Sequence, residues 1–100
     1  MSPSAEGEPF QLGFSKDISD TIKKLQRQAS REGRGEKFLE ALRVIVERLQ
    51  SNPNEFGEPL YSLPMLRLRI RCAALRPIYV DFAVSEDLPS VHIKAVKLLS

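Results

Sequence analysis

The hydrophobic pattern of this chain changes from a helical to a strand-like period near Phe56. Between residues 15 and 52 apolar side chains recur at the spacing of a helix, whereas from residue 56 onward they alternate as in strands. One further alternating segment, residues 10–14, precedes the helical part. Helices and strands that are segregated along the chain predict an α+β domain, in which one face of a small antiparallel sheet packs on a helical hairpin.

Two helices are expected, joined by a turn at residues 30–35 that contains two glycines. Ser15 or Asp17 can cap the first helix, because a short polar side chain accepts a hydrogen bond from the first turn. The second helix begins near Glu36 and ends before Pro53, since the residue before a proline avoids helical geometry. Each helix carries one apolar stripe for the core: Ile18, Ile22, Leu25 and Ala29 in the first, and Phe38, Leu39, Leu42, Ile45, Val46 and Leu49 in the second.

Four strands are expected after the helices, at residues 60–63, 66–72, 78–84 and 91–98. Short connections between them favour an antiparallel meander, so the element order is β-α-α-β-β-β-β. In the third of these strands, one alternating apolar set is expected to face the core: Ile78, Val80, Phe82 and Val84. The last strand leaves its facing open, because its apolar residues fall on both parities: Val91, Ile93 and Ala95 on one, Val96 and Leu98 on the other.

Length and composition predict one cytoplasmic domain over residues 10–100, preceded by a flexible tail at residues 1–9. The first residues are acidic and precede no apolar segment, so no secretory signal is expected. No apolar run approaches the ~20 residues needed to span a bilayer, and no membrane partner is expected. Cys72 is the only cysteine, which fits a reducing compartment, and on the apolar face of its strand it is expected to be an inert core residue.

Arginines alternate with apolar residues through residues 66–71. Successive side chains of a strand point to opposite faces, so this segment is expected to direct its apolar members, Leu66, Leu68 and Ile70, into the core. The outer face would then carry three neighbouring cations: Arg67, Arg69 and Arg71. Guanidinium groups that close repel one another, which suggests an anionic partner such as phosphate. The alternative is the ordinary solvated face of an antiparallel strand.

Most catalytic constellations are missing from the sequence. His92 is the only histidine, and together with the single cysteine this excludes multi-histidine and cysteine-rich zinc sites. The glycines at 33 and 35 follow a helix rather than a strand, and no GK[ST] sequence follows them, so they do not form a phosphate-binding loop. No cofactor and no metal are expected.

The outer face of the expected sheet is the most plausible binding surface. Besides the arginines it would gather Tyr79, Asp81, His92 and Lys94, and arginine binds phosphate while bases stack on tyrosine. Asp81 opens another interpretation, in which it neutralises Arg69 or Arg71 across the strand pair. His92 can transfer protons near neutral pH, but a solvated surface histidine is the simpler interpretation.

The chain resembles the RelE/ParE superfamily of bacterial toxin–antitoxin toxins. The resemblance lies in the order and spacing of four segments, residues 48–53, 57–60, 66–71 and 76–80, and it extends from Phe10 to Leu99. It implies the toxin component of a type II system, of the RelE-like kind that cleaves messenger RNA on the ribosome and inhibits translation. It also implies a cognate antitoxin as partner.

The resemblance further implies site residues. Arg67 and Arg69 stand where the RelE branch places two strand lysines, and Arg76 stands where it places the arginine that opens the next strand. These three would be catalytic, because fixed cations stabilise the charge that develops on the phosphate. The remaining cationic and aromatic residues of the same face would bind RNA: Arg71, Tyr79, His92 and Lys94.

Two departures from the RelE pattern keep other functions open. Residues 73–75 are Ala-Ala-Leu where that branch has a Gly-Asp-Tyr-like turn, and residues 97–100 offer no counterpart of its final arginine and tyrosine. A non-enzymatic protein is therefore the alternative, either a ParE-like inhibitor of DNA gyrase or a catalytically degenerate relative. A third possibility is an interaction module whose arginines contact an acidic protein segment.

Overall fold

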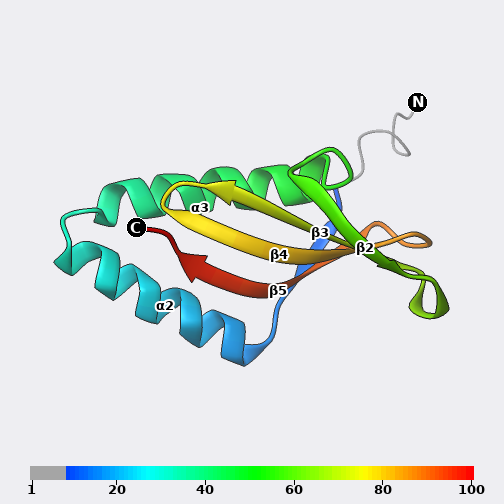
Figure 1. Cartoon of the computed structure of the whole chain (residues 1–100), viewed down its shortest axis with the longest axis horizontal. Coiled ribbons are helices and arrows are strands. Elements are labelled where there is room, and N and C mark those ends of the chain that lie inside the picture. Colours follow the sequence, from blue (N-terminus) through cyan, green and yellow to red (C-terminus); the bar gives the residue numbers. More distant parts are fainter. Residues whose placement is uncertain (1–8) are drawn as a thin grey trace.

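The computed structural model describes residues 9–100, so residues 1–8 of the expected tail lie outside it. Two helices and five strands follow one another in the expected order, which confirms the α+β class (Figure 1). Their bounds are as follows: β1 Gln11–Gly13, α2 Lys16–Arg31, α3 Gly35–Ser51, β2 Glu58–Leu63, β3 Leu68–Leu75, β4 Ile78–Ser85 and β5 Ser90–Leu98. A short 3₁₀ turn, η1 at Pro64–Leu66, joins β2 to β3. Within residues 9–100, no helix has both the length and the apolar character that crossing a membrane requires.

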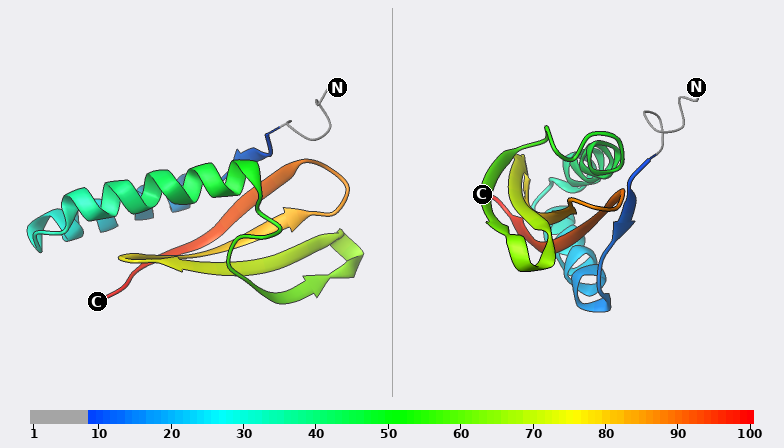
Figure 2. Two further views of the ribbon diagram at one scale, coloured as in Figure 1. Left: turned by 90° about the horizontal axis from the view of Figure 1, so that it is seen from above. Right: turned by 90° about the vertical axis from the view of Figure 1, so that its right-hand side faces the viewer.

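The sheet has the strand order β1-β5-β4-β3-β2. Strands β2 to β5 form the expected antiparallel meander, but β1 pairs with β5 in parallel, so the expectation of a purely antiparallel sheet is wrong at this edge. The two helices carry the chain from β1 to the opposite edge, and the meander then returns across the sheet to β1. Figure 2 shows α3 running along one side of this twisted sheet.

Both helices begin and pack largely as the sequence predicts. The Ser15 hydroxyl caps α2 by accepting a hydrogen bond from the backbone N–H of Ile18 at 3.2 Å. In α3 the fully buried positions are Phe38, Ala41, Ile45 and Leu49. Leu39 was expected in the core, yet its side chain is 48% exposed, because it lies one helical step away from the face that contacts the sheet.

Strand β4 supplies the centre of the core, with Ile78, Val80, Phe82 and Val84 all buried against the helices.

A β-bulge in β5 determines which of its side chains face the helices, a question that the sequence left open. Phe82 pairs with Ile93 and Asp81 with Ala95, so the residue between them on β5, Lys94, has no partner in β4. The extra residue shifts the parity, and the helix-facing side of β5 therefore carries apolar residues on both sides of the bulge: Val91, Ile93, Val96 and Leu98.

Candidate nucleic-acid interface

The arginines of β3 face the helices, not the open side of the sheet. Arg69 pairs with Val84 and Arg71 with Phe82, and directly paired residues point to the same face. Because Val84 and Phe82 belong to the core beneath the helices, the expected orientation of the alternating segment is wrong.

The apolar residues Leu68 and Ile70 therefore lie on the face of the sheet that the helices do not cover. Ile70 is only 2% exposed, but it lies on the opposite face, between its partners Tyr61 and Ala83. Leu68 shares that face with it. Leu66 is the last residue of the 3₁₀ turn, and its side chain is 64% exposed. Arg67 follows it, immediately before β3, with a left-handed φ of 55°. The sequence pattern was correct about alternation but assigned the wrong face to the core.

Arg71 is a structural residue of the loop between α3 and β2. Its Nε donates to the carbonyl oxygen of Phe56 at 3.1 Å, and its NH2 group donates to that of Gly57 at 3.1 Å. Phe56 in turn stacks on Phe82, with ring centroids 6.0 Å apart and an interplanar angle of 24°. Arg71 therefore holds the loop residue that closes this end of the core.

Arg67 and Arg69 are exposed and paired with acids of the β4–β5 turn. Arg67 NH2 lies 2.9 Å from Asp87 Oδ1, and Arg69 Nε lies 3.3 Å from Glu86 Oε2. The side chains of the two arginines are 63% and 57% exposed. The interpretation that Asp81 neutralises the strand arginines is wrong, because Asp81 lies on the other face of the sheet.

A fourth arginine belongs to the same end of the molecule. The guanidinium of Arg48, in the last turn of α3, lies 5.2 Å from the centroid of the Phe56 ring, whose carbonyl oxygen Arg71 contacts. We call Arg48, Arg67, Arg69 and Arg71 the arginine row. In Figure 1 the β2–β3 hairpin and the β4–β5 turn project beyond both helices at this end. Within the row, the exposed guanidinium groups of Arg67 and Arg69 can bind phosphates of a nucleic acid.

Sequence reasoning missed Arg48 as a member of this group. In the sequence it is one of several charges on the exposed side of an amphipathic helix. Its approach to β3 depends on how the loop after α3 folds back, with Phe56 between the two arginines. No spacing rule in the sequence predicts that contact.

The aromatic and imidazole groups that were expected beside the arginines lie on the opposite face. Tyr79 and His92 pair with Ala74 and Ala83, which do not face the helices, and Lys94 is the exposed residue of the bulge. The structure therefore separates Tyr79 and His92 from the arginine row. They form no common surface of the kind that the sequence suggested.

Tyr79 belongs instead to a small polar cluster on that opposite face. The pKa of Tyr79 is raised above the ordinary tyrosine value, because its hydroxyl interacts with the Asp81 carboxylate and, secondly, with the Cys72 thiol. Asp81 Oδ1 is buried and has no hydrogen-bond partner among the described residues. Cys72 is half-buried here, so the expectation that it lies in the helix-packed core is wrong. The ammonium of Lys97 lies 5.8 Å from the centroid of the Tyr79 ring.

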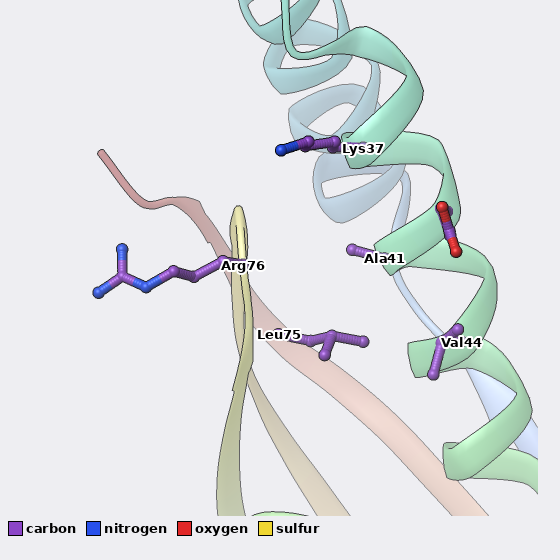
Figure 3. Close-up of a pocket in the computed structure, with 6 residues that line it drawn as sticks. Lys37, Ala41, Val44, Leu75 and Arg76 are labelled. Atoms are coloured by element: carbon purple, nitrogen blue, oxygen red, sulfur yellow. The ribbon is translucent and has the colours of Figure 1, made fainter.

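Arg76 lies at the other end of β3 from the arginine row. At about 3.3 Å per residue, the strand separates its Cα from that of Arg69 by about 23 Å. Its NH1 group donates to the carbonyl oxygen of Ser100 at 2.9 Å. In Figure 3 its side chain points away from α3, whereas Leu75 points toward α3. The three residues expected to be catalytic, Arg67, Arg69 and Arg76, are therefore not brought together.

The cavity of Figure 3 has a volume of about 360 Å³ and separates the β3–β4 turn from α3. Its walls combine three apolar residues, Ala41, Val44 and Leu75, with three charged ones, Lys37, Glu40 and Arg76. Across the part of the chain that the structure describes, no three histidine, cysteine or acidic side chains are grouped in a way that could hold a metal ion. Comparison with protein-family models, with curated proteins and with solved structures gives no match to this chain.

Proposed function

We propose that this protein is a RelE-like toxin, or a homologue of one, from a type II toxin–antitoxin system, and that it inhibits translation by binding ribosome-bound messenger RNA. The observation that carries the proposal is the arginine row, in which Arg67 and Arg69 present exposed guanidinium groups at a projecting end of the molecule. The element order and the resemblance of four segments to the RelE/ParE superfamily support the same proposal.

Within the row the arginines have different roles. Arg67 and Arg69 bind phosphate, because their contacts are to exposed carboxylates that solvent can replace. Arg71 positions the loop, since both of its hydrogen bonds go to backbone carbonyl oxygens. Arg48 adds positive charge behind them and steers the RNA toward the hairpin.

Binding without cleavage is the second candidate, and one observation favours it. Arg76 is about 23 Å along β3 from Arg69, too far for both side chains to contact one reacting phosphate. The protein would then block translation by occupancy, or act on another target such as DNA gyrase in the manner of the ParE branch.

The expected antitoxin would dock between the helices. A cavity of about 220 Å³ opens there, and most of its walls are apolar: Leu12, Phe14, Ile22, Leu42, Val46 and Ile93. Lys23 of α2 also lines this cavity, and its side chain is exposed and has no ion pair among the described residues. We propose an acidic amphipathic helix as the occupant, because its apolar side fits the cavity and its charge complements α2.

The test is induction of the chain in cells and in a purified translation system, followed by mapping of messenger RNA ends. The proposed function predicts arrested translation, with Arg67→Ala/Arg69→Ala losing most of the effect. The matched control is Arg27→Ala/Arg31→Ala, which removes the same charge from α2 and should keep the effect.

New messenger RNA ends within codons would establish cleavage, and arrest without new ends would establish the non-cleaving form. Cleaved DNA that depends on gyrase would instead establish the ParE-like activity. Normal growth and normal translation with the intact chain would contradict the proposed function.

A further inference from the structure

We infer that Glu86 and Asp87 occupy the positions of RNA phosphates on Arg69 and Arg67, and that they restrict binding to ligands with several phosphates. The inference rests on the proposed function and adds to it two residues that decide which anions bind. They belong to the β4–β5 turn, for which the sequence predicts only a short connection between two strands.

The contacts resemble those that a phosphate would make. Each arginine has a carboxylate oxygen within ion-pair distance, at 2.9 Å for Arg67 and 3.3 Å for Arg69. A guanidinium group offers five N–H donors, so donors remain on each arginine beyond those directed at the carboxylate. An incoming phosphate can therefore first contact an arginine and then replace the acid.

The turn that carries the acids is fixed by bonds that do not depend on the ion pairs. The Ser85 hydroxyl accepts hydrogen bonds from the backbone N–H groups of Asp87 and Leu88, at 3.2 and 3.0 Å. The backbone N–H of Glu86 donates to the carbonyl oxygen of Arg67 at 2.9 Å. This bond joins the β4–β5 turn to the β2–β3 connection. Displacing the carboxylates therefore requires only side-chain rotation, while the backbone keeps both arginines in place.

The energetic balance favours polyvalent ligands. An exposed ion pair contributes little, so the acids are displaced at low cost when several phosphates bind together. A single phosphate exchanges one carboxylate contact for one phosphate contact, with no net advantage, whereas the second phosphate of one strand binds at the high effective concentration that the first contact provides. Glu86 and Asp87 thus suppress weak binding of small anions, whereas RNA, which carries several phosphates, displaces both carboxylates and binds.

The experiment compares the intact chain with Glu86→Gln/Asp87→Asn, whose side chains keep their shape and lose their charge. The control, Glu36→Gln/Glu40→Gln, changes the net charge equally on α3, where neither glutamate has an ion pair among the described residues. Binding of a short single-stranded oligouridylate is measured by fluorescence anisotropy. Glu86→Gln/Asp87→Asn should bind about three- to tenfold more tightly than the control.

The inference is overturned if the intact chain binds the oligouridylate and Glu86→Gln/Asp87→Asn binds it no more tightly than the control does. If no form binds RNA, the proposed function fails, and elution from a heparin column decides the inference separately. Later elution of Glu86→Gln/Asp87→Asn than of the control supports the inference that the two acids occupy anion positions on Arg67 and Arg69. Equal elution contradicts it.

Discussion

Arg71→Ala should destabilise the fold far more than removal of either neighbouring arginine. Arg71 makes two hydrogen bonds with backbone carbonyl oxygens, each at 3.1 Å, and its side chain is half-buried. Hydrogen bonds to charged groups contribute about 1.5–3 kcal/mol each, and partial exposure places the expected loss at about 2–4 kcal/mol in total. Arg69→Ala removes only an exposed ion pair, so it should cost no more than about 1 kcal/mol.

The assay is urea unfolding of the intact chain, Arg71→Ala, Arg71→Lys and Arg69→Ala. In thermal unfolding of the same variants, the loss at position 71 corresponds to a fall in melting temperature of about 10–20 °C for a domain of this size. Lysine keeps the charge but lacks the guanidinium fork, so Arg71→Lys should recover less than half of the loss. Equal stabilities of Arg71→Ala and Arg69→Ala would refute the assignment of separate roles within the row.

Three further predictions concern the backbone and two titrating groups. Gly57→Ala should cost at least about 2 kcal/mol in urea unfolding, since φ is +72° and an added Cβ would lie 2.0 Å from a facing carbonyl oxygen. In a Tyr61→Phe background, Tyr79 should ionise well above its ordinary value of 10.0 when followed by ultraviolet absorbance. Because the fold favours the protonated phenol, stability should be complete below pH 10 and decline above it, and Tyr79→Phe should remove that decline. Arg34 lowers the pKa of Glu32, so the stability from this pair should be present above pH 4.5 and lost as pH falls through the folded value. A Glu32→Gln variant whose acid unfolding matches that of the intact chain would contradict this last prediction.

The fold was largely predictable because helical and strand periods occupy separate parts of the chain. The limits of α3 follow from the turn glycines and Pro53, and β4 has one unambiguous alternating set. The facing of β5 was not predictable, because a bulge at Lys94 changes the parity within the strand. Apolar residues on both parities indicate that the alternation breaks within the strand, but they do not show at which residue.

The candidate site was predictable in residue type but not in arrangement. Alternation correctly separated Arg69 and Arg71 from Ile70, yet it does not say which face the helices cover. Ile70 is buried on the face away from the helices, so apolar character alone pointed to the wrong side. The pairing of Arg69 with Glu86 joins a residue of β3 to one of the β4–β5 turn, and no local pattern connects them.

The central claim is that Arg67 and Arg69 bind RNA phosphates. The most direct measurement is the affinity of the intact chain and of Arg67→Ala/Arg69→Ala for a single-stranded oligouridylate over a range of salt concentrations. Each phosphate contact with a single strand contributes about 0.7 to the slope of log affinity against log salt. The double variant should therefore bind more weakly at low salt, with a slope shallower by about 1.4. Equal affinities and equal slopes would contradict the claim.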